Sequence, residues 1–411
     1  MKKMWRCLCT TAFIASLLSG CNNQQTATAD EKIHIEFFQN KPEAVATFDQ
    51  LIERFEKLHP NIDIEQNNVP DADTVLRTRL VKEDVPDLLA IGGNATYGDI
   101  AEEGLFYDFS KDSAINKVIP NYVNMLNLLG RTNKEDNGIP FATNANMLLY
   151  NKDKFKELGL QVPKTWDELI NVSKLIQKQG ELPFYFTYKD AWTAMVSFNA
   201  LAGNLQGDNF IQDLDSNKTT FTDRYKETLE KMLTLLDYGH KDNFGRDYNA
   251  GNRAFANGDS VMYIQGSWAI SAIKAINPNI KLGSFPLPAS NDSSQNKLVS
   301  GVDTALTMSK DTPHKKEALM FIHFLLEKEN SQYYIKEQNS FSAVKNVLQN
   351  DEALKELNPY FEQQKITSFP EHYFPASMQT ANLVQDFLIK GEVKPFLSKL
   401  DGEWNKVKAR E

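Results

Sequence analysis

Cysteine is nearly absent from this chain of 411 residues, because all three cysteines lie within the first twenty-one positions. Cys7 and Cys9 lie inside an N-terminal segment that ends at Cys21. If that segment is removed, the folded part can form no disulfide, no thiolate metal site and no cysteine nucleophile. Long apolar runs are also missing, since no later stretch approaches the roughly eighteen apolar residues of a membrane-spanning helix.

An excess of positive charge is lacking too. Lys and Arg total 45 against 54 Asp and Glu, which gives a net charge of −9. The first twenty residues carry three basic and no acidic side chains, so residues 21–411 have a net charge of −12. Because a surface this acidic repels the phosphates of nucleic acids, we expect no nucleic-acid partner.

Familiar catalytic motifs are absent as well. The sequence contains no HExxH, no GxSxG and no P-loop, and its six histidines are scattered. Carboxylates are abundant, but a retaining glycosidase needs two of them about 5 Å apart, which a sequence cannot show. Most of these acids are explained as solvated helix faces. We therefore expect no enzyme, no cofactor and no metal site, with a surface glycoside hydrolase as the alternative from another class.

The N-terminal segment has the pattern of a signal peptide. Lys2, Lys3 and Arg6 form a basic start, and an apolar stretch follows from Ala12 to Leu18. The segment ends in Leu-Ser-Gly-Cys at Cys21, which resembles the lipobox of bacterial lipoproteins. This resemblance implies that residues 1–20 are removed and that Cys21 carries the lipid. We expect a location on the extracytoplasmic face of the cell membrane.

A polar segment follows the predicted lipid. Residues 22–31, NNQQTATADE, contain no aromatic and no large aliphatic side chain. Such a segment cannot bury a core, so we expect residues 21–31 to form a disordered tether.

The folded part alternates strand and helix patterns at its start. This alternation predicts an α/β fold with mostly parallel strands, in which ligands bind at the carboxyl ends of the strands. The expected elements are a strand at 33–38, a helix at 45–58, a strand at 62–64, a helix at 73–81, a strand at 87–91 and a helix at 96–103.

Further helices are predicted in the rest of the chain. Thr165 and Glu168 form a capping-box pattern at the start of a helix that runs through Leu175. Other helices are expected at 225–238, 315–328 and 381–407. About 390 residues exceed what one core usually holds, so two lobes are expected.

Several segments together resemble the sugar-binding proteins of bacterial ABC importers, the group that contains the maltose-binding protein, and the tail is more similar to the multiple-sugar and raffinose type. They are Val85–Leu88 with Gly104-Leu105, Gly138–Pro140, Leu149–Lys152, Val162–Leu169, Phe255–Asp259, Val261-Met262, Gly266–Trp268 and the tail His372–Pro375.

The resemblance implies a two-lobed clamp of the periplasmic-binding-protein type, in which the chain crosses between lobes three times. The crossings are expected near residues 142–147, 298–302 and 340–348. Lobe 1 would comprise residues 32–142 and 302–342. Lobe 2 would comprise residues 143–301 and 343–411.

Aromatic side chains are the first candidates for the binding site, because the flat C–H faces of a sugar pack on aromatic rings. Trp268 follows Gly266-Ser267, and in the family an aromatic residue after this glycine stacks on a sugar ring. The alternative is that Trp268 caps the core. Trp192 is a second candidate, with core packing as its alternative. Trp166 follows a helix N-cap, and we expect it to be structural.

Polar side chains near strand ends are the second set of candidates, because sugar hydroxyls need hydrogen bonds. The alternative for Asn94 is that it serves the turn in αL geometry. The alternative for His372 and Tyr373 is a solvated loop. Relatives of the maltose type have a sugar-contacting carboxylate at the position of Asn144. The polar candidates are Gln39, Asn40, Asn94, Asn144, Asp303, His372 and Tyr373.

The predicted function is that of a monomeric, lipid-anchored receptor. It binds an oligosaccharide and delivers it to the transmembrane subunits of an ABC permease. Two alternatives remain within the same class of binding proteins. One is a receptor for another solute, such as a polyol phosphate or a polyamine, and the other is a sensory binding protein that docks on a receptor.

Overall fold

The computed structural model describes residues 32–70, 72–80, 82, 84–130 and 135–409. The predicted signal peptide, Cys21 and the predicted tether lie outside these residues. Within the described ranges no helix has the length and apolar character needed to cross a membrane.

One mixed sheet forms the centre of the described chain. Its main path runs in the order β2-β1-β3-β7-β4-β5, while β6 and β8 pair with β4 and β9 pairs with β7. The strands are β1 (Ile33–Gln39), β2 (Ile62–Asn67), β3 (Leu88–Ile91), β4 (Ile139–Asn151), β5 (Met262–Gly266), β6 (Leu282–Phe285), β7 (Leu298–Met308), β8 (Phe341–Ser342) and β9 (Ile366–Thr367).

The strand directions correct the expectation of a mostly parallel sheet. β1 is parallel to β2 and β3, and β7 is parallel to β9. All pairings made by β4 and the pairing of β3 with β7 are antiparallel. The alternation of strands and helices predicts only the first three strands correctly, because β4 and β7 are long strands that return through the sheet from distant parts of the chain.

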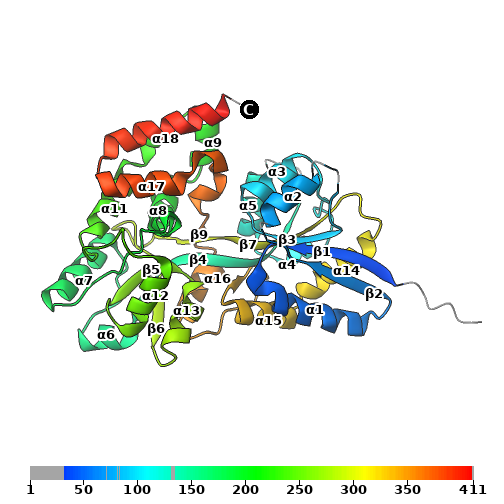
Figure 1. Ribbon diagram of the computed structural model, residues 1–411, viewed down its shortest axis with the longest axis horizontal. Helices are drawn as coiled ribbons and strands as arrows, with labels where there is room; N and C mark the ends of the chain where they lie inside the picture. Colours follow the sequence, from blue (N-terminus) through cyan, green and yellow to red (C-terminus); the bar gives the residue numbers. More distant parts are fainter. Residues whose placement is uncertain (1–31, 71, 81, 83, 131–134, 410–411) are drawn as a thin grey trace, which may run out of the picture.

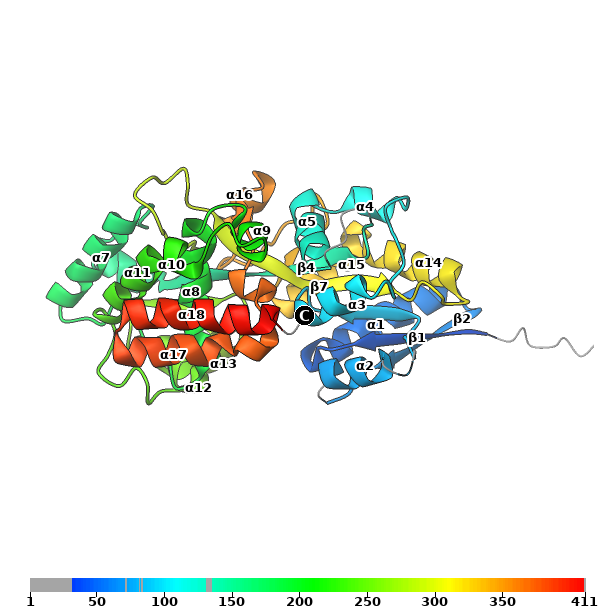
Figure 2. The ribbon, with the colours of Figure 1, turned by 90° about the horizontal axis from the view of Figure 1, so that it is seen from above.

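The elements gather into two groups, with β4, β7 and β9 running between them (Figure 1). The right-hand group holds α1 (Val45–Leu58), α2 (Ala72–Leu80), α3 (Ala95–Glu102), α4 (Ala114–Lys117), α5 (Pro120–Leu129), α14 (Lys315–Leu325) and α15 (Lys328–Gln338). The left-hand group holds α6 (Lys152–Glu157), α7 (Trp166–Lys178), α8 (Ala191–Leu205), α9 (Phe210–Asp215), α10 (Phe221–Arg224), α11 (Lys226–Leu236), α12 (Tyr248–Asn257), α13 (Ala269–Ile276), α17 (Thr380–Lys390) and α18 (Val393–Lys408). The short α16 (Asn358–Glu362) lies between the groups, at the rear (Figure 2).

The two long strands connect these groups. The first half of β4 pairs with β7, and its second half pairs with β5 and β6. The three expected crossings fall on β4, on the start of β7 and on the segment that begins with β8. This mixed α/β architecture with two lobes is the predicted fold class, while the lobe boundaries in the sequence stay a prediction.

Local sequence signals explain where several helices begin and end. The capping box at Thr165 and Glu168 is present, and α7 begins at the next residue, Trp166. The helix expected at 315–328 ends at Leu325, and a second helix, α15, follows. The helix expected at 381–407 is two helices, because Gly391 has φ +70° and ends α17.

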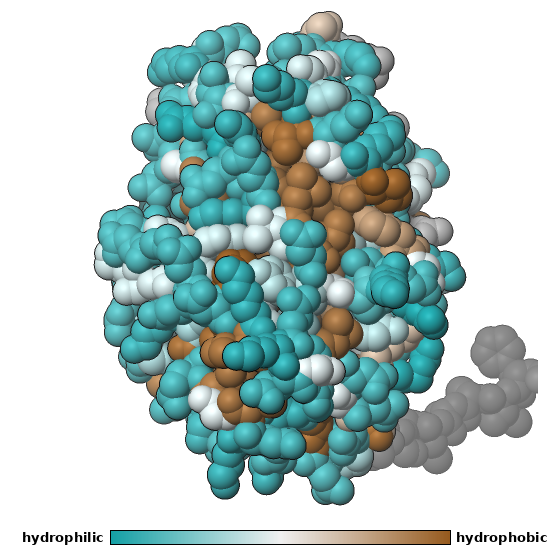
Figure 3. Space-filling model, turned by 90° about the vertical axis from the view of Figure 1, so that its left-hand side faces the viewer, coloured by the Kyte–Doolittle hydropathy of each residue, from teal (hydrophilic) through white to brown (hydrophobic). Residues whose placement is uncertain are grey.

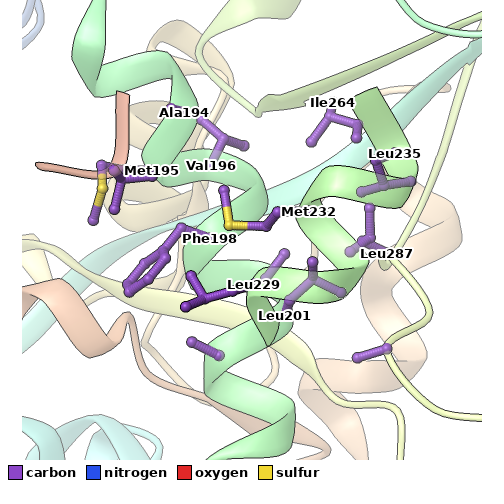
Figure 4. Packing of buried hydrophobic residues seen from close by; sticks show 14 of the residues in the cluster. Ala194, Met195, Val196, Phe198, Leu201, Leu229, Met232, Leu235, Ile264 and Leu287 are labelled. Atoms are coloured by element: carbon purple, nitrogen blue, oxygen red, sulfur yellow. The ribbon is translucent and has the colours of Figure 1, made fainter. Parts of the chain in front are cut away.

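Three clusters of buried hydrophobic side chains hold the fold together. One lies in the right-hand group, where the ring of Phe37 meets those of Phe48 and Phe321 edge-on. A second surrounds α8 in the left-hand group, where α8 and α11 interdigitate (Figure 4). The third joins the groups, since it combines Ile91 of β3 with Ile270 of α13. Burial of these side chains is the main force that holds both groups on the sheet.

The outer face of the left-hand group is mostly hydrophilic. A band of hydrophobic residues nevertheless runs through its upper half (Figure 3). Among the helices of this group, α7, α8, α13 and α17 carry the exposed side chains Leu175, Trp192, Ile276 and Ile389, in that order.

Candidate functional site

Three aromatic rings gather where three helices of the left-hand group begin. The ring centroid of Trp192 lies 5.1 Å from that of Tyr248 and 6.3 Å from that of Trp268. Trp192 is 42% exposed, and the other two rings are half-buried. Exposed aromatic rings in a group offer flat apolar faces to a ligand.

Helix starts fix the positions of these rings. Trp192 lies in the first turn of α8, Tyr248 is the first residue of α12, and Trp268 directly precedes α13. The carboxylate of Asp190 accepts a hydrogen bond of 2.8 Å from the backbone N–H of Tyr248. One acidic side chain therefore ties together the starts of α8 and α12.

Gly266 provides the space for the indole of Trp268. A Cβ atom on Gly266 would lie 2.1 to 2.4 Å from three atoms of this ring. Gly266 does not have a positive φ, so the glycine is needed here for close approach rather than for an unusual backbone. The backbone N–H of Ser267 donates to the carbonyl of Ala145 at 3.2 Å, which holds Trp268 beside β4.

A polar group lies next to the aromatic rings and is centred on Asp303. In the register of β4 and β7, Asp303 is an extra residue at an irregularity, because Val302 pairs with Thr143 and Thr304 with Ala142. Such bulges redirect a side chain. Its carboxylate accepts from Nδ2 of Asn144 at 3.1 Å and pairs with Nζ of Lys41 at 2.5 Å.

The aromatic and polar groups share one face of β4. Asn144 and Asn146 alternate along the strand and point to the same face, opposite Gly301 and Gly266 respectively. The indole of Trp268 occupies the side-chain position of Gly266. The ring of Phe369 occupies that of Gly301 in the same way, and Cε1 of His372, from the tail, lies 3.3 Å from the same position. Two glycines thus open one continuous stretch of the sheet to side chains from elsewhere.

The structure brings several predicted residues together. Asn144 and Asp303 are in direct contact, His372 adjoins them, and Trp192 and Trp268 face each other. Core packing does not explain Trp192, since that ring is exposed. Trp268 lies between the two alternatives, ligand stacking and core packing, because part of its ring is buried against two of the hydrophobic clusters.

Other predicted residues have different surroundings. Gln39 is fully buried. Its Nε2 donates to the side chain of Gln66, and its Oε1 accepts from the backbone N–H of Lys41. Gln39 therefore supports Lys41 and is closed to a ligand. Oδ1 of Asn94 accepts from two N–H groups at the start of α3, so this side chain caps the helix from an extended backbone with φ −139°. Asn40 directly follows β1, and its N–H donates to the carbonyl of Ala90 at 3.4 Å.

Two further predictions concern bulky side chains. Tyr373 lines a groove of about 220 Å³ between the ends of α5 and α9, away from the aromatic rings. Trp166 is 9% exposed and packs in the left-hand cluster with Nζ of Lys231 4.9 Å above its ring, so it is structural as expected.

Sequence reasoning missed Tyr248, Asp190 and Lys41. Lys41 lies two residues after Gln39, where β1 ends, so the argument from strand ends could have included it. Tyr248 follows Asp247, an N-cap whose side chain accepts from the N–H of Ala250. An aromatic residue at a helix start, as at Trp192, was the signal available in the sequence.

Two neighbouring titratable groups at the start of the tail have pKa shifts of opposite sign. Burial raises the pKa of Glu371 to about 7, although a hydrogen bond from Asn199 at 2.6 Å opposes this. Burial lowers the pKa of His372 to about 4, although Asp303 and the backbone of Gly93 favour its charged form. The His372 ring is therefore neutral at neutral pH and offers hydrogen bonds without a charge.

Within the described ranges, no cluster of His, Cys, Asp and Glu is suited to a metal ion. The arrangement instead combines apolar ring faces with amides, a carboxylate and an ammonium group at the junction of two lobes. Apolar ring faces beside hydrogen-bonding groups are suited to a ligand that carries both hydroxyls and apolar faces.

Comparison with known proteins shows the class to which the chain belongs. Residues 39–332 match the family described as bacterial extracellular solute-binding protein, and the chain belongs to that family. It is 33% identical over 341 residues to the multiple sugar-binding protein of Streptococcus mutans serotype c (strain ATCC 700610 / UA159), covering 80% of each chain. It is 26% identical over 200 residues to the sn-glycerol-3-phosphate-binding periplasmic protein UgpB of Escherichia coli (strain K12), covering 47% of this chain and 45% of that protein.

Solved structures of one relative are similar over nearly the whole chain. The apo form of RafE from Streptococcus pneumoniae has a TM-score of 0.82 at 29% identity, covering 92% of this chain and 98% of that chain. RafE in complex with raffinose has a TM-score of 0.77 at 30% identity, covering 92% of this chain and all of that chain. The protein is thus a sugar-binding solute receptor of the ABC-transporter type.

Trp192→Ala is expected to weaken sugar binding at least tenfold and to leave thermal stability nearly unchanged. An exposed ring has little packing to lose in the free protein, whereas loss of a stacked ring removes about 0.5–1.5 kcal/mol plus buried area. Tyr333→Ala is the matched control, because Tyr333 is a half-buried aromatic on α15 beside Arg54. Calorimetry with raffinose and thermal melting measure both effects. Unchanged affinity in Trp192→Ala would remove this ring from the site.

Glu371→Gln is expected to change the pH dependence of stability. Because the folded state raises the pKa of Glu371 from 4.5 to about 7, its protonated form stabilises the fold below pH 4.5 and this contribution is lost as the pH rises to 7. Glutamine cannot ionise. The free energy of unfolding of the variant, measured relative to wild type, is therefore expected to be higher at pH 7.5 than at pH 4.5. Urea titrations at both pH values measure this gain, with the exposed Glu157→Gln as control. A gain that is the same at both pH values contradicts the assignment.

Proposed function

We propose that this protein is a lipid-anchored extracytoplasmic receptor that binds a neutral oligosaccharide and delivers it to an ABC permease. The observation that carries the proposal is the position of three aromatic rings beside the Asn144–Asp303–Lys41 group. Rings bind the faces of sugar units, and the polar group binds their hydroxyls. More than one ring favours a ligand of more than one sugar unit.

The relatives support an oligosaccharide. RafE was solved with raffinose, a trisaccharide, and the Streptococcus mutans relative is a multiple sugar-binding protein. We therefore propose a raffinose-like oligosaccharide as the first ligand to test. Family membership also supports the proposals that the ligand passes to a permease and that the bound sugar is returned unchanged.

The proposed mechanism is closure of two lobes around the sugar. We propose residues 32–142 and 302–342 as lobe 1, and residues 143–301 and 343–411 as lobe 2. A ligand can favour the closed form only by the contacts that the open form lacks, and a shift from 1:99 to 99:1 requires about 5.5 kcal/mol. Stacked rings with several hydrogen bonds of about 1 kcal/mol each are sufficient. The higher TM-score to apo RafE than to its raffinose complex supports a starting state arranged as in the ligand-free relative.

A second candidate is an anionic polyol, because UgpB is a partial relative. The electrostatics of the site disfavour it. Lys41 already pairs with Asp303, and Nδ2 of Asn144 donates to the same carboxylate. A phosphate placed there has to compete with Asp303 for these donors and is repelled by its charge.

A ligand panel tests the proposed function. We expect the domain to bind at least one neutral oligosaccharide among raffinose, stachyose, maltodextrins and fructo-oligosaccharides in calorimetry, and to bind glycerol 3-phosphate more weakly. Chromatography after prolonged incubation is expected to recover the sugar intact. Preference for glycerol 3-phosphate would establish the anionic alternative, and protein-dependent cleavage would establish a hydrolase.

The anchor is tested separately. Cys21→Ala is expected to release most of the protein from the membrane fraction, because the polar residues 22–31 cannot replace acyl chains as a membrane anchor. Fractionation of cells with an immunoblot measures this, and the apparent mass shows whether the signal was cleaved. A cleaved variant that stays with the membrane as completely as wild type would contradict the lipid anchor.

A further inference from the structure

Unpaired buried polar atoms occur together on the shared face of β4. Oδ1 of Asn144, Oδ1 of Asn146 and Nε1 of Trp268 are buried, and none has a hydrogen-bond partner among the residues that the structure describes. Leaving such groups unpaired is costly, so several in one place indicate a missing hydrogen-bonding partner.

The orientation of the two amides is determined by their donors. Nδ2 of Asn144 donates to the carboxylate of Asp303 at 3.1 Å, and Nδ2 of Asn146 donates to the carbonyl of Val196 on α8 at 3.1 Å. Both amide groups therefore turn an oxygen, and not a nitrogen, toward the unpaired side. The residue that carries the second oxygen, Asn146, is only 2% exposed.

The indole of Trp268 lies against this pair of amides. Gly266 is the direct cross-strand partner of Asn146, and the indole occupies the space where a side chain of Gly266 would be. Asn144 is two residues along the same strand and points to the same face. Two amide oxygens thus lie on one face beside this indole, whose six-membered ring (Cε3, Cζ3 and Cη2) is the part that lies over Gly266.

We propose that Asn146, with Asn144, binds hydroxyl groups of the sugar that stacks on Trp268, and that the indole moves from Gly266 to admit them. Neighbouring hydroxyls of a pyranose supply two O–H donors, which match the two amide oxygens. A fully ionised phosphate has no O–H to donate to these oxygens. This inference rests on the proposed sugar-binding function and assigns Asn146 a role in specificity for neutral sugars.

Paired Asn→Leu variants test the inference. Asn146→Leu is expected to bind raffinose at least tenfold more weakly than wild type. The matched control is Asn296→Leu, because Asn296 is 5% exposed and both ends of its amide are bonded, to the backbones of Lys164, Ala289 and Ser290. The control is expected to lower the melting temperature more than Asn146→Leu does and to keep the wild-type affinity.

The Trp268→Phe variant keeps an aromatic ring and removes the indole N–H, so it measures the contribution of the N–H alone. We expect a loss of raffinose affinity that is smaller than that of Trp268→Ala, because the ring remains but its donor is gone. Monodeoxy analogues of raffinose identify the occupant. At least one missing hydroxyl is expected to weaken binding to wild type without weakening binding to Asn146→Leu further.

The outcomes separate this inference from the proposed function. If wild type binds raffinose but Asn146→Leu binds it equally well, the inference is wrong and the proposed function stands. If Asn146→Leu loses affinity equally for raffinose and for every monodeoxy analogue, the occupant is a water molecule and the sugar contact is wrong. If wild type binds no neutral sugar of the panel, the proposed function and this inference are both wrong.

Discussion

The antiparallel pairing of β4 with β7 is the constraint on which the rest of the site depends. It places Asn144 opposite Gly301, and the irregularity in the same ladder makes Asp303 the extra residue that reaches Asn144. Because the ladder lies between the two groups of helices, its side chains are available to both. A shift of register by one residue would turn Asn144 and Asn146 to the opposite face, so the site exists only in this register.

Charge in the site is balanced within the protein. Asp303 uses its two carboxylate oxygens for Lys41 and Asn144. The side chains of Lys41 and Asp303 are both more than four-fifths buried. Burial lowers the pKa of His372 and so keeps its ring neutral. A partly buried pair of this kind contributes little net stability, since desolvation opposes its attraction, but it fixes the geometry of its members. Such a surface suits a ligand that brings hydroxyls and no charge, because no unbalanced charge has to be neutralised.

The sequence allows prediction of those parts that depend on local pattern. The strands at 33–38 and 87–91 and the capping box at Thr165 follow from periodicity and helix chemistry. The proposal that Trp268 and Asn144 contact the sugar rests on family resemblance. The antiparallel pairings could not be predicted, because they join residues more than a hundred positions apart, as Asn146 and Gly266 are. Tyr248 carries a local signal, an aromatic residue at a helix start, but its position beside Trp192 depends on how the starts of α12 and α8 approach each other.

Trp268 lies where two hydrophobic clusters of the fold meet. Its indole is partly buried against two hydrophobic clusters, one within the left-hand group and one that joins both groups. The same ring leaves its N–H unpaired in a dry environment, which makes its resting position less favourable than packing alone suggests. A ligand that satisfies this N–H changes the balance of contacts at the very cluster that joins the groups. Differential contact of this kind is what a clamp requires, because a ligand can bias the closed form only through interactions that the open form lacks.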